Sequence, residues 1–308
     1  MAFGAWPIAG ISTRDVNETD SRATIAAALD HGVNFLDTAY CYGRAGESER
    51  LIGEVLAARR RDDVVLATKG GVHFPPVGPQ VQDARPETLR RQCEESLRRL
   101  RVEAVELHYL HAPDARVPVA ESAGAIADLM AAGKVRAAGA SNCTLEQLEE
   151  FHRTCPVAAV QLPYNMLQRD IERRTVPWCL TRGIAVTAYW PLMKGLLAGR
   201  IDSPAALASD DSRRTYPMYQ GEEFDRNRAL VRRLQAVADA RGCTVAQLVV
   251  NWTLDQPGIT SVLCGARRPW QIAETAGAMG WRLADVEKQS IAEALAERGV
   301  AAAKRVFE

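Results

Sequence analysis

The sequence predicts a (β/α)8 TIM barrel that forms a single domain over residues 1–308. Short apolar runs alternate with helical segments along the whole chain, which is the pattern of parallel strands joined by crossover helices. No low-complexity tract and no Ser/Gly-rich linker divides the chain. The doubly wound open sheet is the main competitor, but the sequence has no GxGxxG, Walker or GxSxG motif. The barrel is therefore the better prediction.

Each expected strand is a short apolar run that follows a helical segment or the chain start. Gly32, Gly133 and Gly183 mark helix ends because glycine is common directly after a last helical turn. Pro86 suits the first turn of a helix, where a missing N–H costs nothing. The expected strands are 3–8, 33–36, 64–67, 104–110, 135–140, 157–161, 184–189 and 259–263, and the expected helices are 19–31, 47–59, 86–100, 119–132, 145–153, 170–181, 224–240, 245–254 and 284–298.

Composition and charge exclude several classes of function. The chain is 47% hydrophobic and 25% charged, which is ordinary for a globular protein. It carries 38 basic and 38 acidic residues, so it has no positive excess with which to bind nucleic acid or an anionic membrane. It has no secretory leader pattern and no apolar run of about 18 residues, so a cytoplasmic protein is expected.

Cysteine and histidine usage argues against a metal-dependent barrel enzyme. The seven cysteines are scattered without a CxxC pair, so neither a disulfide framework nor a zinc site is expected. Only five histidines are present, with no HxH and no HExxH pattern. We therefore expect no metal.

Polar residues or glycine follow seven successive expected strands. In a barrel the C-terminal strand ends carry the chemistry, whereas the interior favours branched apolar side chains. One aspartate or lysine at such a place has an ordinary explanation as a turn former or a solvated group. Seven in succession are hard to attribute to packing. They are Asp37, Lys69, His111, Ser141 with Asn142, Gln161, Tyr189 and Gly265.

Seven segments resemble, in order, the motifs of the aldo-keto reductase superfamily. The first is GVNFLDTAYCYG at 32–43, and the resemblance covers essentially the whole chain. The others are ATKG at 67–70, LHAPD at 110–114, GASN at 139–142, VQLPYN at 160–165, AYWPL at 188–192 with GLLAG at 195–199, and GARR at 265–268 leading to Glu274.

The resemblance implies a catalytic tetrad of Asp37, Tyr42, Lys69 and His111. Tyr42 would give a proton to the developing alkoxide, and the nearby Lys69 ammonium would make that proton easier to release. Asp37 would keep Lys69 charged and oriented, and His111 would position the substrate oxygen. Tyr40 competes for the acid role, but the family pattern places the acid directly before a glycine, so Tyr42 is preferred.

His108 lies three residues before His111. At the two-residue period of a strand it points to the opposite face, so a structural role is expected.

The resemblance also implies a nicotinamide cofactor, with NADPH expected over NADH. Arg267 would meet the 2′-phosphate through a charge-assisted contact. Thr275 replaces the family's usual asparagine, and Trp190 replaces a small residue beside the stacking Tyr189. The short hairpin that usually covers the barrel bottom does not precede the first strand, so either the sequence starts late or that end is open. The implied cofactor residues are Trp6, Ser141, Asn142, Gln161, Tyr189, Pro191, Leu192, Lys194, Leu196, Gly265, Arg267, Gln271 and Glu274.

The expected function is NADPH-dependent reduction of small or medium aldehydes or ketones. Two alternatives stay open: a sugar or alcohol dehydrogenase working in the oxidative direction, and a slow NADPH-binding regulatory subunit resembling the β subunits of potassium channels. The only partner expected is a small-molecule carbonyl or alcohol, with no nucleic acid and no membrane. The sequence does not choose between a monomer and a homo-oligomer.

Overall fold

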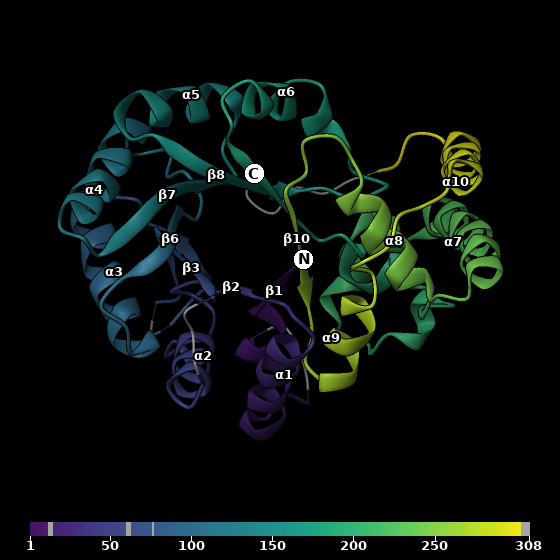
Figure 1. The fold of residues 1–308 in the computed structure, drawn as a ribbon, viewed down its shortest axis with the longest axis horizontal. Helices are drawn as coiled ribbons and strands as arrows, with labels where there is room; N and C mark the ends of the chain where they lie inside the picture. Colours follow the sequence, from purple (N-terminus) through teal and green to yellow (C-terminus); the bar gives the residue numbers. More distant parts are fainter. Residues whose placement is uncertain (12–14, 60–62, 76, 303–308) are drawn as a thin grey trace.

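Eight strands close into a parallel barrel in the order β1-β10-β9-β8-β7-β6-β3-β2 (Figure 1). The computed structural model describes residues 1–11, 15–59, 63–75 and 77–302. The strands are β1 (Ala2–Gly4), β2 (Phe35–Asp37), β3 (Val65–Gly70), β6 (Val105–Leu110), β7 (Val135–Ser141), β8 (Val157–Pro163), β9 (Ala185–Tyr189) and β10 (Ser261–Gly265). The predicted fold class is confirmed.

Helices form a ring outside the strands and bury their apolar faces against them (Figure 1). Several begin at side-chain caps: Asn17 accepts from the backbone N–H of Asp20, and Thr144 and Thr244 each form a capping box. The helices are α1 (Glu18–Asp30), α2 (Glu47–Ala57), α3 (Pro86–Leu100), α4 (Val119–Ala131), α5 (Leu145–Thr154), α6 (Thr175–Leu180), α7 (Gly221–Arg241), α8 (Val245–Leu254), α9 (Pro269–Ala276) and α10 (Asp285–Arg298).

Two expected elements are wrong in their extent. The first strand ends at Gly4 rather than at residue 8, and Trp6 lies instead on a 3-10 turn, η1 (Trp6–Ala9), because Pro7 has no N–H for a ladder. The single helix expected over 170–181 is a 3-10 turn, η2 (Asp170–Glu172), followed by α6. Pro177 in the first turn of α6 cannot donate to a preceding carbonyl, so the helix restarts there.

Two further elements lie outside the expected pattern. The loop after β3 forms a small antiparallel hairpin of β4 (Val72–His73) and β5 (Val81–Gln82). The segment after β10 forms α9, which packs beside α1 (Figure 1). Both elements follow strand ends, so they lie on the face where the site residues are found.

The barrel interior holds an apolar cluster around the ring of Tyr109, with Phe35 packed against it. Tyr109 is fully buried there with Ala67, Leu107 and Ala159. The ring of Tyr109 lies so close to the next strand that a Cβ added to Gly139 would meet its Cδ1 at 2.4 Å. The interior is thus a packed floor beneath the strand ends.

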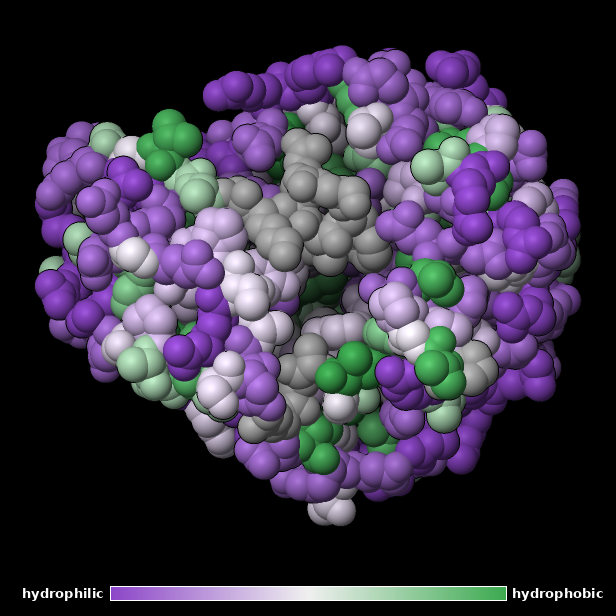
Figure 2. Space-filling view, turned by 180° about the vertical axis from the view of Figure 1, so that it is seen from behind, coloured by the Kyte–Doolittle hydropathy of each residue, from purple (hydrophilic) through white to green (hydrophobic). Residues whose placement is uncertain are grey.

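The face of the molecule shown in Figure 2 is mostly hydrophilic, and its apolar residues occur in small groups separated by hydrophilic ones around a central hollow. No helix among the described residues has the length and apolar character needed to cross a membrane.

Candidate active site

The barrel brings the four tetrad residues together at the C-terminal ends of neighbouring strands. Asp37 is the last residue of β2, Lys69 lies in β3, and His111 directly follows β6. β3 pairs with both β2 and β6, so these three residues are neighbours in the sheet. Tyr42 lies in the loop after β2 and is partly exposed, whereas the other three are buried.

The Lys69 ammonium is surrounded by three oxygen acceptors. It forms an ion pair with the Asp37 carboxylate, and both side chains are at most 1% exposed. It also donates to the Thr38 carbonyl at 2.7 Å and to the Tyr42 hydroxyl at 3.4 Å. The three donors of a lysine are thus matched by three oxygens, which fixes a positive charge beside the phenol.

Burial shifts the titration of this group of residues. It raises the pKa of Asp37, and the Lys69 ammonium opposes that rise. It raises the pKa of Tyr42 well above its ordinary value, and the Asp37 charge adds to the rise. The net shift of the Tyr42 pKa is upward, contrary to the expectation of an acidified phenol. Tyr42 therefore holds its proton at neutral pH.

His111 is a neutral imidazole at neutral pH. Burial lowers its pKa well below the ordinary value, and the nearby Lys69 charge lowers it further. Its ring packs edge-on against Tyr42 with centroids 5.9 Å apart, and Trp6 packs edge-on against Tyr42 at 5.0 Å. These contacts hold the Tyr42 ring between the two.

The two competing tyrosines of the segment lie in different surroundings. The Tyr40 hydroxyl donates to the Glu95 carboxylate at 2.6 Å, and the Arg99 guanidinium lies 4.4 Å from the ring centroid. The Tyr40 side chain thus packs against α3. His108 is fully buried, and its ring lies beside Gly70.

A hydrogen-bonded network continues from the tetrad around the barrel mouth. The Gln161 side-chain amide donates to the second carboxylate oxygen of Asp37 at 2.8 Å, and the Ser141 hydroxyl donates to the backbone carbonyl of Gln161 at 2.9 Å. The Asn142 amide donates to the His111 carbonyl at 2.9 Å and accepts from the Tyr189 hydroxyl at 2.8 Å. These residues form one shelf, and the polar groups of Gln161 and Asn142 are engaged within it.

The loop after β9 has an unusual backbone. Trp190, Met193 and Lys194 all have positive φ, and the loop continues as a 3-10 segment, η3 (Met193–Ala198). The Lys194 ammonium donates to the Tyr216 hydroxyl at 2.8 Å and lies 4.7 Å from the Trp190 ring centroid. Pro191 and Leu196 of this loop are buried, and Leu192 is partly buried. Non-glycine residues in this conformation are costly, and they concentrate at functional loops.

The start of α9 carries the other expected cofactor residues. Gln271 accepts from the Arg267 backbone N–H at 2.9 Å, and Glu274 forms an ion pair with Arg200 at 2.7 Å. Arg268 forms an ion pair with Asp20 at 3.0 Å. Gly265 is exposed at the strand end, with Pro7 so close that a Cβ would meet its Cγ at 2.8 Å.

The hydroxyl of Thr275, which stands where the family usually has asparagine, donates to the Gln271 carbonyl at 3.2 Å. It is therefore used within α9 itself.

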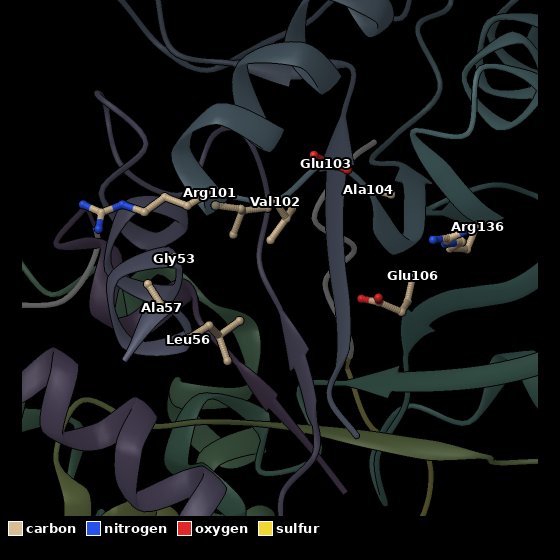
Figure 3. A pocket seen from close by; sticks show the side chains of 10 residues that line it. Gly53, Leu56, Ala57, Arg101, Val102, Glu103, Ala104, Glu106 and Arg136 are labelled. Carbon is tan, nitrogen blue, oxygen red and sulfur yellow. The ribbon is translucent and has the colours of Figure 1, made fainter. Parts of the chain in front are cut away.

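A cavity of about 340 Å³ lies at the opposite end of the barrel (Figure 3). It is lined by the last turns of α2 and α3 and by Glu106 and Arg136, near the starts of β6 and β7. None of the expected site residues lines it. Within the described ranges, no group of three or more His, Cys, Asp or Glu side chains is arranged to hold a metal ion.

Comparison with known proteins places this geometry in a family. The model of the aldo/keto reductase family matches residues 1–296. The chain belongs to the aldo/keto reductase family. It is 34% identical over 293 residues to aldo-keto reductase YhdN of Bacillus subtilis (strain 168), covering 94% of this chain and 88% of that protein. It is 30% identical over 295 residues to probable aldo-keto reductase 1 of Glycine max, covering 96% and 85%.

Solved structures agree with the sequence relatives. Glycerol dehydrogenase AKR11B4 from Gluconobacter oxydans superposes with a TM-score of 0.90 at 35% identity, covering 100% of this chain and 94% of that one. The holo form of aldo-keto reductase AKR11C1 from Bacillus halodurans gives a TM-score of 0.81 at 25% identity, covering 97% and 93%. This aldo/keto reductase is therefore an NAD(P)-dependent oxidoreductase of the carbonyl reductase and alcohol dehydrogenase class.

The residues of the shelf fit a nicotinamide cofactor. A partly exposed aromatic ring, Tyr189, stands beside amide and hydroxyl groups at the strand ends, which suits a flat polar ring. Arg267 and Arg268 precede the N-terminus of α9, where a phosphate is favoured by both charge and helix dipole.

Several residues at this site were not predicted from the sequence. Cys41 contacts His111, and Gln80 contacts Cys41 from the hairpin after β3. Tyr216 binds Lys194 from a distant loop, which no local pattern reveals. Tyr109 could have been predicted, because it lies in β6 two residues before His111, and this spacing places both on the same side.

Proposed function

We propose that this enzyme reduces aldehydes or ketones with NADPH, and that Tyr42 is the proton donor. The observation that carries the proposal is the position of the Tyr42 hydroxyl, 3.4 Å from a buried ammonium that is itself paired with Asp37. A neutral His111 lies at the same place. A fixed positive charge beside a protonated phenol suits a reaction in which an oxygen gains negative charge.

Each of the four tetrad residues has its own role in the proposed reaction. When bound, the cofactor supplies hydride to the carbonyl carbon. The Tyr42 Oη–H gives its proton to the carbonyl oxygen, and the Lys69 Nζ ammonium stabilises the phenolate that is left. Asp37 keeps the ammonium charged and in place, and His111 orients the carbonyl oxygen by hydrogen bonding. In the reverse direction the Tyr42 phenolate accepts the proton of an alcohol.

The preference for NADPH is assigned to Arg267. A charged hydrogen bond to the 2′-phosphate contributes about 1.5–3 kcal/mol, and NADH lacks that phosphate. Arg267→Ala should therefore weaken NADPH binding by tenfold or more and leave NADH binding nearly unchanged. Arg90→Ala on α3, which removes an exposed arginine paired with Asp128, is the control. Equal weakening of NADPH binding and NADH binding in Arg267→Ala would contradict the assignment.

Oxidation of an alcohol or polyol is the second candidate. It is favoured by the 35% identity to a protein named glycerol dehydrogenase over the whole of this chain. The tetrad serves both directions, because proton transfer at Tyr42 is reversible.

The test compares the two directions on one enzyme preparation. NADPH consumption with 4-nitrobenzaldehyde measures reduction, and NADP⁺ reduction with glycerol measures oxidation. The proposal predicts a larger kcat/KM for the aldehyde with NADPH. A larger value for glycerol would favour the second candidate, and turnover in neither direction despite tight NADPH binding would contradict both.

A further inference from the structure

We propose that Cys41 is a positioning residue that fixes the tautomer of His111. Its thiol donates to Nδ1 of the imidazole and so keeps the ring proton on Nε2. The catalytic consequence rests on the proposed function, because only there does Nε2–H face a carbonyl oxygen. The contact itself does not depend on that function.

The contacts of Cys41 leave its thiol proton available for His111. Cys41 Sγ lies 3.5 Å from Nδ1 of His111 and 3.4 Å from Nε2 of Gln80. The Gln80 amide nitrogen can only donate, so the sulfur accepts there. The thiol's single proton is then available for Nδ1 of His111. The chain of donors runs from Gln80 through Cys41 to His111.

The protonation states agree with this direction. Burial raises the pKa of Cys41 to about 12, so the group is a thiol rather than a thiolate at neutral pH. Burial also lowers the pKa of His111 well below its ordinary value, so the imidazole is neutral. A neutral imidazole carries its proton on one nitrogen only, and a nitrogen that accepts from a thiol leaves the proton on the other.

The apolar surroundings of Cys41 strengthen its hydrogen bond to His111, which would be weak in water. Cys41 is 1% exposed and packs with Ala39, Val72 and Ala112, with Phe74 beside this cluster. In such an apolar environment a thiol hydrogen bond is electrostatically stronger than in solvent. Because Cys41 directly precedes Tyr42, the same short loop sets both the proton donor and the tautomer of its neighbour.

The consequence for reduction is geometric. His111 can orient a carbonyl oxygen only by donating an N–H to it. With the proton on Nε2 and Nδ1 occupied by the thiol, one ring nitrogen is a fixed donor. Loss of the thiol removes the donor to Nδ1 that favours the Nε2–H tautomer, which lowers the fraction of enzyme ready to orient substrate.

The test uses Cys41→Ala, which removes the donor, and Cys41→Ser, which restores an O–H at the same place. Cys93→Ala is the matched control, because Cys93 is equally buried but lies on α3 away from the tetrad. Infrared difference spectra of the S–H stretch, wild type minus each alanine variant, isolate the two thiols. ¹⁵N NMR of the histidine-labelled full-length enzyme reads the His111 tautomer without any substrate.

We expect the Cys41 S–H band to be shifted to lower frequency relative to the Cys93 band, and His111 to be the Nε2–H tautomer. In Cys41→Ala the His111 signals should move toward a mixture of tautomers. The kcat for carbonyl reduction should fall about fivefold, the effect of one neutral hydrogen bond. KM and NADPH affinity should stay unchanged, Cys41→Ser should recover kcat, and Cys93→Ala should keep it.

An Nδ1–H tautomer in the wild type, or His111 signals that are identical in Cys41→Ala, would overturn the proposal. Equal loss of kcat in Cys41→Ala and Cys41→Ser would also overturn it, because that result indicates a packing role. If the spectra are as expected but the wild type reduces no carbonyl, the proposed function fails while the thiol contact is upheld.

Discussion

Replacing Asp37 with asparagine should destabilise the protein by about 3–5 kcal/mol, because it removes the charge that compensates a buried ammonium. Asp37 and Lys69 are at most 1% exposed, so solvent cannot take over that role. One Asp37 oxygen accepts from Lys69 and the other accepts from Gln161 at 2.8 Å. Asparagine offers only one acceptor oxygen, so a donor is also left unsatisfied, at a cost of about 1–3 kcal/mol.

The assay is urea unfolding at neutral pH with linear extrapolation to water. Asp30→Asn is the control, because Asp30 pairs with Arg59 at the surface and its side chain is 58% exposed. That variant should lose less than about 1 kcal/mol. A loss of less than about 1 kcal/mol in Asp37→Asn as well would refute the reasoning, since it would mean that Lys69 is solvated or neutral in the folded protein.

Three further predictions concern stability. Burial lowers the pKa of His108 to about 4, so the unfolded chain binds a proton near pH 6 that the folded protein does not. His108 should therefore contribute a loss of about 3 kcal/mol in stability between pH 7 and pH 4, and denaturation curves of His108→Leu should show a shallower fall. Gly53→Ala should cost about 1–3 kcal/mol, because its Cβ would meet the Arg99 carbonyl at 2.6 Å. Gly124→Ala should gain about 0.5–1 kcal/mol in thermal or urea unfolding, because nothing lies within 4 Å of the new Cβ. A stabilising Gly53→Ala would contradict the close packing of α2 on α3.

Periodicity and glycine positions were sufficient to predict the barrel, because each strand is a short apolar run and most helices end at recognisable signals. The failures were local. Pro7 and Pro177 interrupt elements whose neighbours look regular, and the missing donor of proline decides both cases. The α9 helix is only eight residues long, and its expected role as a phosphate-binding segment did not reveal its helical form.

Polar residues were expected at the C-terminal ends of the strands, and those of β2, β3 and β6 lie together because these strands are neighbours. That expectation could not reveal how those residues bond to each other. Gln161 was expected as a cofactor contact, yet its amide nitrogen holds Asp37. The contact of Cys41 with His111 joins residues 70 positions apart, and its partner Gln80 comes from a hairpin with no sequence signal.

The direction of the Tyr42 pKa shift also depended on burial, which the spacing of residues in the sequence does not show. A lysine beside a phenol lowers the phenol's pKa when both are solvated, but here burial and the Asp37 charge act in the other direction. Under the proposed function, Lys69 therefore stabilises the phenolate as it forms rather than lowering the pKa of the resting hydroxyl.

The most direct test of the account compares Tyr42→Phe with Tyr40→Phe. Each removes one hydroxyl from the same loop, but only the Tyr42 hydroxyl contacts Lys69, whereas that of Tyr40 donates to Glu95. NADPH binding is measured by fluorescence, and turnover by NADPH consumption with 4-nitrobenzaldehyde. We predict that Tyr42→Phe binds NADPH like the wild type but loses at least about 100-fold in kcat, while Tyr40→Phe keeps its activity. Full activity in Tyr42→Phe would contradict the account.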